Sequence, residues 1–139
     1  RTPERMEALV SFIEERRQVL DLEVKVLGAS PDAMIPGLKG PRAACTREGI
    51  FESDVMLVPL EDGDRCQALV NMGKTVIVID LNPLSRSAQQ ATITVVDELS
   101  RSLNTMLAFA QEERRAVDAY DHQANLKASL AWIADAVNR

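Results

Sequence analysis

The sequence predicts an α/β protein whose parallel sheet of about four strands is flanked by helices. Residues 75–79 and 92–96 are rich in β-branched residues and have the composition of strands buried on both faces. A continuous apolar run at 55–59 predicts another strand. Segments with helical signals separate these runs, and alternation of strands and helices is typical of a parallel, right-handed sheet.

The first part of the chain is predicted to hold a helix, a strand and a long loop. Thr2 can cap a helix over 3–20, because Pro3 suits the first helical position and apolar residues then recur at helical spacing. Residues 23–27 alternate between polar and apolar, which predicts a short strand. Residues 30–41 contain three prolines and two glycines and are predicted to form a loop.

Helices are predicted between and after the remaining strands. The Asp62-Gly63-Asp64 turn can cap a helix. A brief helix over 67–72 then ends at Gly73, and glycine is common directly after a helix. The other predicted helices cover part of 41–51, then 85–90, 99–116 and 126–137.

Length and composition indicate one globular domain over residues 1–139, with 46% apolar residues. A net charge of −5, spread along the chain, argues against general nucleic-acid binding. No apolar run has the length of a membrane span, and no secretory signal is visible. Cys45 and Cys66 lack metal-ligand spacing, so we expect reduced thiols in a cytoplasmic protein. The chain starts at Arg1, which indicates a fragment or a processed product.

Polar residues follow the three clearest strands. In open parallel sheets, ligands bind outside the carboxyl ends of the strands. The residues there are Asp62, Asp64 and Arg65 after the first strand, Asp80 and Asn82 after the second, and Asp97 and Glu98 after the third. We expect these side chains to converge on one crevice.

The stretch from Asp80 to Ser87 carries the most chemical information. Asn82 offers both a donor and an acceptor to a purine edge. Arg86 presents a cationic fork that suits phosphate, and Ser85, with nearby backbone N–H groups, can cap a helix that holds an anion. The alternative is a plain strand-to-helix turn in which the polar side chains only cap and Arg86 lies in solvent.

The other carboxylates also have two interpretations. Asp62 and Asp64 either hold Mg²⁺ or a substrate ammonium group, or form an Asp-Gly turn with a helix cap. Asp97 and Glu98 either bind ribose hydroxyls or a metal, or begin a helix. The single histidine, His122, lies away from the strand ends, which argues against a histidine-dependent triad. Neither a Walker A nor a G-x-G-x-x-G pattern occurs, so a nicotinamide-dependent oxidoreductase is disfavoured.

Several motifs together resemble a known enzyme family. They include Ile35-Pro36-Gly37-Leu38, Pro59-Leu60-Glu61-Asp62-Gly63-Asp64-Arg65, Met72-Gly73-Lys74 and the unbroken run from Val76 to Arg86. Over residues 1–104 the sequence resembles archaeal phosphopantothenate synthetase, also called phosphopantoate–β-alanine ligase. The tail after Asn104 adds no motif to this resemblance.

The resemblance implies a homodimer with a Rossmann-like sheet. The family makes phosphopantothenate, AMP and pyrophosphate from phosphopantoate, β-alanine and ATP. By resemblance, the ATP contacts are Asp80, Leu81, Asn82, Arg86 and Ser87, followed by a further stretch at Asp97 and Glu98. Mg²⁺ is expected to offset charge on the triphosphate.

The sequence departs from the family pattern at a few points. Ser87 stands where the family usually has threonine, which keeps the hydroxyl, and Glu98 stands where asparagine is common, which replaces an amide by a carboxylate. Residues 102–104 lack a proline that the family tends to have. The family also has a further helical N-terminal portion with other ATP contacts, so this chain corresponds to the C-terminal portion.

The expected chemistry proceeds through an acyl-adenylate, with Arg86 contacting phosphate. Arg42 and Arg65 are weaker candidates for binding the phosphate or carboxylate of phosphopantoate. Either Asp62 or Asp64 is expected to accept or orient the proton of the β-alanine amine, and the sequence does not choose between them. The alternative function is a non-catalytic, dimerising α/β module that binds a nucleotide or a phosphorylated metabolite.

Overall fold

The computed structural model describes residues 2–59, 62–112 and 119–138. The chain forms two compact units, residues 1–53 and 54–139, and each is described by itself below. Among the described residues, no helix combines the length and the apolar character needed to cross a membrane. The expectation of a single domain stays a prediction.

The first unit begins with helix α1 (Pro3–Val19), as the sequence predicts. The Thr2 hydroxyl accepts a hydrogen bond from the amide of Arg5 at 3.4 Å and so caps the first turn. Proline at the start of the helix costs no internal hydrogen bond, because the first N–H groups have no partner within a helix. Local capping chemistry therefore fixes where α1 begins.

Two predictions in the first unit are wrong. Residues 23–27 form no strand, and two short strands lie in and beyond the predicted loop instead. Strand β1 (Ala33–Met34) pairs antiparallel with β2 (Ala44–Cys45). A strand needs a hydrogen-bonded neighbour as well as alternating residues, and alternation alone does not supply one. Between and after these strands lie a 3₁₀ turn, η1 (Gly40–Arg42), and a π-helical turn, η2 (Arg47–Phe51).

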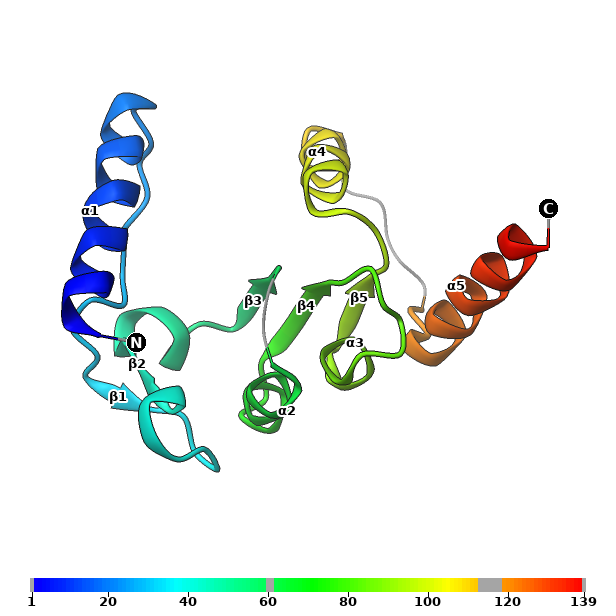
Figure 1. Ribbon diagram of the computed structural model, residues 1–139, viewed down its shortest axis with the longest axis horizontal. Coiled ribbons are helices and arrows are strands. Elements are labelled where there is room, and N and C mark those ends of the chain that lie inside the picture. The colour runs from blue at the N-terminus through cyan, green and yellow to red at the C-terminus, as the bar shows by residue number, and fades with distance from the viewer. Residues whose placement is uncertain (1, 60–61, 113–118, 139) are drawn as a thin grey trace. The chain divides into compact units, whose positions relative to one another are not determined.

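The second unit contains a parallel sheet of three strands rather than the expected four. Strands β3 (Val55–Val58), β4 (Thr75–Ile79) and β5 (Ile93–Val95) lie side by side in that order (Figure 1). Both pairings are parallel, with Val55 opposite Thr75 and Ile77 opposite Ile93. The α/β class and all three strands of this sheet agree with the sequence prediction.

Two helices connect the strands of this sheet and pack against each other. Helix α2 (Gly63–Asn71) joins β3 to β4, and helix α3 (Arg86–Gln90) joins β4 to β5. Leu69 and Cys66 of α2 are fully buried, and so is Ala88 of α3. Helix α2 begins at residue 63, before the predicted start at 67, because Asp62 caps it.

The last two helices of the second unit are α4 (Leu99–Ala110) and α5 (His122–Val137). The prediction extended α4 to residue 116, but the helix ends at Ala110 and residues 111–112 form a turn and a bend; residues 113–118 lie outside the described residues. Helix α5 starts four positions before the predicted 126, because the carboxylate of Asp121 accepts a hydrogen bond from the amide of Ala124 at 2.9 Å.

The start of α5 is attached to the outer edge of β5. The Asn125 side chain donates to the carbonyl of Thr94 at 2.8 Å, and the amide of Thr94 donates to the Tyr120 hydroxyl at 3.3 Å. These side chains satisfy backbone groups that a further strand would otherwise occupy. The contacts therefore close this edge at Thr94 and fix α5 beside the sheet.

Candidate active site at the carboxyl ends of the strands

The first turns of α2 and α3 touch each other at the carboxyl end of the sheet. A Cβ atom placed on Gly63 would lie 2.3 Å from the Cβ of Arg86 and 3.0 Å from its backbone carbonyl carbon. Glycine is therefore required at this position by close approach of two backbones. The contact brings the N-termini of two helices, with their N–H groups that have no partner inside the helix, to one place.

Asp80 organises the turn between β4 and α3. One carboxylate oxygen accepts from the Asn82 amide at 2.9 Å, and the other accepts from the Ser85 hydroxyl at 2.5 Å. The Ser85 hydroxyl oxygen in turn accepts from the amide of Ala88 at 2.9 Å and caps α3. The Asn82 side-chain oxygen accepts from the Leu84 amide at 3.0 Å, which leaves its nitrogen as the donor for recognition.

A cavity of about 230 Å³ lies at the ends of all three strands. The residues that line it are Val58, Pro59, Val78, Ile79, Asp80, Leu81, Ser87, Asp97 and Leu99. Four of the predicted ATP contacts therefore surround one cavity: Asp80, Leu81, Ser87 and Asp97. Of the seven strand-end side chains that we expected to converge, Asp80 and Asp97 line this cavity. The other five, Asp62, Asp64, Arg65, Asn82 and Glu98, are not among the residues that line it.

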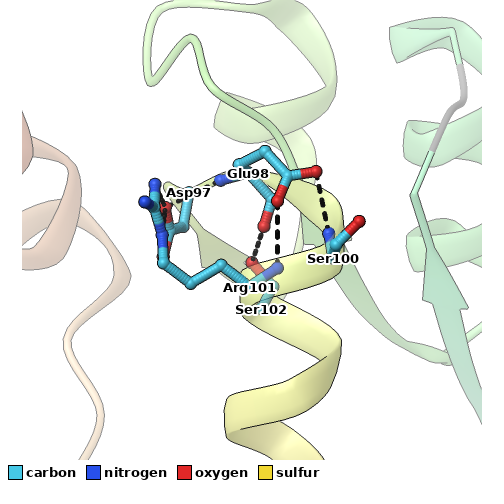
Figure 2. Close-up of polar contacts among 5 residues, drawn as sticks. All are labelled: Asp97, Glu98, Ser100, Arg101 and Ser102. Carbon is cyan, nitrogen blue, oxygen red and sulfur yellow. Dashed lines mark hydrogen bonds and ion pairs between the residues drawn. The ribbon is translucent and has the colours of Figure 1, made fainter.

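Asp97 and Glu98 have different structural tasks at the start of α4 (Figure 2). Asp97 forms an ion pair with Arg101, whose Nε donates to its two carboxylate oxygens at 2.7 and 2.9 Å. Glu98 caps α4, because its carboxylate accepts from the amides of Ser100 at 2.9 Å and Arg101 at 3.0 Å. The helix-start interpretation thus describes Glu98 well, while Asp97 also lines the crevice.

These contacts favour the charged forms of both carboxylates. The hydrogen bond from Arg101, followed by that from the Glu98 amide, lowers the pKa of Asp97 below its ordinary value. The backbone hydrogen bonds from Ser100 and Arg101 lower the pKa of Glu98. The pKa of Arg101 is raised, first by the hydrogen bond to Asp97. A stable negative charge therefore lies at the rim of the crevice near neutral pH.

The remaining predicted residues of the second unit lie around the two helix starts. Asp62 caps α2 by accepting from the Arg65 amide at 2.9 Å. Asp64 forms an ion pair with Arg86, in which the arginine side chain stays 73% exposed. Arg65 is half-buried in the first turn of α2.

Arg42 lies in the other unit, in the short turn η1. Within the described residues, no group of three or more His, Cys, Asp or Glu side chains gathers as a metal site.

Two residues with evident structural roles were not predicted. Gly63 permits the approach of α2 to α3, and Arg101 holds Asp97. The spacing of four between Asp97 and Arg101 on a helical segment was the available signal for that pair. Nothing in the sequence indicates that Gly63 meets Arg86, because 22 other residues separate them along the chain.

Similarity to known proteins shows to which family this chain belongs. The family described as phosphopantothenate/pantothenate synthetase matches residues 1–136. The chain belongs to this family. A 4-phosphopantoate–β-alanine ligase of Thermococcus kodakarensis is 43% identical over 143 aligned positions, which cover 97% of this chain and 55% of that protein. The ligase of the same name from Methanosarcina mazei is 47% identical over 117 positions, covering 78% of this chain and 46% of that protein.

The chain spans about half the length of the curated relatives it matches. The match to the phosphopantothenate/pantothenate synthetase family continues through α5, well beyond residue 104, where the motifs stop. The matched residues therefore include α4 and nearly all of α5.

Replacing Gly63 with alanine is predicted to destabilise the second unit, although alanine favours a helix over glycine by about 0.5–1 kcal/mol. The new methyl group would overlap Arg86, and overpacking costs roughly 1–3 kcal/mol. Urea unfolding measures the change. Asn104→Ala, at an exposed position of α4, controls for helix propensity, and a Gly63→Ala protein more stable than the wild type, as helix propensity alone would give, would refute the close contact.

Stability is predicted to fall in acid, partly through Asp97 and Glu98. Their folded pKa values lie below the ordinary ones, so their stabilisation is present above the unfolded pKa and is lost as the pH falls through the folded values. Glu98→Gln keeps an oxygen for the helix cap but does not titrate. Between about pH 5 and pH 3 it should lose less unfolding free energy than the wild type.

Glu23→Gln, at an exposed position of the first unit, controls for the loss of one charge in this acid titration. Equal acid sensitivity of the wild type and Glu98→Gln would show that the capping carboxylate contributes nothing to the pH dependence.

Proposed function

We propose that this chain is the part of an ATP-dependent ligase that binds nucleotide and joins phosphopantoate to β-alanine, on the route to coenzyme A. The observation that carries the proposal is the crevice at the carboxyl ends of β3, β4 and β5, where Asp80, Ser87 and Asp97 meet. The names of the curated relatives support the choice of substrates. The proposal places the enzyme in the cytoplasm as a homodimer.

The proposed reaction has two steps. A carboxylate oxygen of phosphopantoate attacks the α-phosphorus of ATP, the bond to the bridging oxygen breaks, and pyrophosphate leaves. The amine of β-alanine then attacks the carbonyl carbon of the acyl-adenylate, forming the amide and releasing AMP and one proton. Both steps develop negative charge on oxygen, which positioned cations and N–H groups stabilise.

Arg86 is the proposed phosphate ligand. Its guanidinium is exposed beside the first turn of α2, so an anion bound there meets both a cationic fork and helix N–H groups. Asp64 shares this position and holds the guanidinium over the helix start. Asp80 acts mainly through the turn it builds, and Asn82 presents its side-chain nitrogen to the nucleotide.

The proton released by the amine needs an acceptor. Asp62 and Asp64 both lie in the first turn region of α2 and remain the two candidates. Asp62 also caps α2, and Asp64 also forms an ion pair with Arg86. Whichever carboxylate accepts the proton therefore has a structural role as well. Arg65 and Arg42 remain proposals for the phosphate or carboxylate of phosphopantoate.

Magnesium is proposed to enter the site bound to the triphosphate. Mg²⁺ in nucleotide sites is held mainly by phosphate oxygens and water, with one or two carboxylates. In the described residues the carboxylates of the crevice, Asp80 and Asp97, are engaged by Ser85 and Arg101 and form no cluster. The described residues thus offer no dedicated cage, and no step above is assigned to the ion.

The two-step route predicts exchange of labelled pyrophosphate into ATP that depends on phosphopantoate and not on β-alanine. Addition of β-alanine should then give AMP in equal amount to amide. The measurement is incubation of the chain with ATP, Mg²⁺ and each substrate in turn, followed by chromatography. Nucleotide binding without any exchange or turnover would instead support a non-catalytic binding module, and ADP formation would refute the adenylate.

Arg86→Ala is predicted to weaken ATP binding by about 1.5–3 kcal/mol, because it removes a charge-assisted hydrogen bond to phosphate. Isothermal titration calorimetry measures the affinity. Arg47→Ala is the matched control, since that guanidinium lies 4.9 Å from the Phe51 ring centre in the first unit. An Arg86→Ala protein that binds ATP as tightly as the control would remove Arg86 from the site.

A further inference from the structure

The junction between α5 and β5 contains a group of polar side chains that the proposed function does not use. The Tyr120 hydroxyl oxygen accepts from the Thr94 amide and from the Asn125 side-chain nitrogen, both at 3.3 Å. The Nδ1 atom of His122 lies 3.4 Å from the same hydroxyl. We call Tyr120, His122 and Asn125 the clasp, because together they attach the first turn of α5 to Thr94.

The hydrogen bonds around the Tyr120 hydroxyl determine which partner donates. A phenol oxygen has one hydrogen to donate and at most two lone pairs with which to accept. Both lone pairs are used, since the Thr94 amide and one hydrogen of the Asn125 side chain donate to this oxygen. The other Asn125 hydrogen goes to the Thr94 carbonyl at 2.8 Å. The phenol hydrogen is therefore donated to His122, whose Nδ1 accepts it.

Only a neutral His122 ring completes the clasp. When Nδ1 accepts, the ring proton is on Nε2, and that nitrogen is buried without a hydrogen-bond partner among the described residues. In the charged ring both nitrogens are donors, so Nδ1 would present a third donor to the Tyr120 hydroxyl. The buried Nε2–H would have no acceptor to replace water. A proton on the ring is therefore incompatible with the closed clasp.

Within the described residues, no side chain forms an ion pair with His122 that would compensate such a proton. Tyr120 is the titratable group that lies against the ring, with the two ring centres 6.2 Å apart. Asp121 is next in the chain, and its carboxylate is engaged as the cap of α5. Thr94 on β5 and Asn125 on α5 carry no charge. The state of the clasp therefore depends on the ring of His122 itself.

We propose that the clasp is a pH-sensitive attachment of α5, which is closed while His122 is neutral and opens when its ring takes up a proton. Histidine is the side chain whose charge ordinarily changes between about pH 5 and pH 8. Opening removes the acceptor of the Thr94 amide, which lies at the edge of the sheet where no strand pairs with β5. The inference concerns the fold and does not depend on the ligase reaction.

Release of α5 would reach the cavity beside the crevice. This second cavity has a volume of about 510 Å³, and Ser129, Trp132 and Ile133 of α5 form one of its walls. Leu81 and Asp97 line both this cavity and the crevice, so the two share a boundary. A clasp that opens in acid therefore changes the shape of the surface next to the crevice.

Amide hydrogen exchange, followed by NMR, tests the clasp. The protection factor of the Thr94 amide, which corrects for the pH dependence of exchange itself, should fall roughly threefold or more from about pH 8 to pH 5, because the amide loses its acceptor. The amides of α5 should lose protection in parallel. The Asp80 amide is the internal control, since it donates to the Val95 carbonyl at 3.1 Å between β4 and β5.

Two variants separate the proton on His122 from other effects of acid. His122→Asn offers an acceptor close to the position of Nδ1 and does not titrate, so its Thr94 amide should be equally protected at both pH values. Tyr120→Phe lacks the hydroxyl and should leave the Thr94 amide weakly protected at both. Circular dichroism establishes that each variant is folded.

His122 is the single histidine of the chain, so the nitrogen chemical shifts of its ring are assigned without ambiguity. At about pH 8 we expect the ring proton on Nε2, and a proton on Nδ1 would overturn the proposal. Constant protection of the Thr94 amide in the wild type would also overturn it, as would an equal fall in His122→Asn. A fall at Thr94 with unchanged amides of α5 would show that the helix stays attached, which contradicts the proposed opening.

Discussion

The backbone of α3 lies against Gly63 in the first turn of α2, and the geometry of the site depends on this contact. Without a side chain at residue 63, the starts of two helices come together beside the ends of β3 and β4. The close approach also places Arg86 within reach of Asp64. A cationic side chain and helix N–H groups thus meet at one point, which is where an anion is best stabilised.

The polar residues at the strand ends hold the local backbone in place. Asp80 shapes the turn that leads into α3, and Glu98 caps α4. Capping and ligand binding are compatible, because a carboxylate has more acceptor positions than one cap uses. The structural interpretation of these residues is therefore compatible with the proposed functional one.

Closure of the β5 edge determines where the C-terminal helix lies. Tyr120 and Asn125 satisfy the backbone of Thr94, so α5 rather than another strand stands beside β5 at that point. This arrangement brings Ser129, Trp132 and Ile133 next to Asp97 and enlarges the concave surface beyond the strand ends.

The sequence by itself determined the three parallel strands, the starts of α1 and α3, and the position of Asp80 and Asp97 at the carboxyl edge of the sheet. These features depend on local signals, namely β-branched runs and capping side chains, and on a general rule for parallel sheets.

Only the tertiary structure decided that residues 23–27 are not a strand, that Gly63 meets Arg86, and that Trp132 lies beside the crevice. Each of these depends on contacts between segments far apart in the chain, which local patterns do not encode.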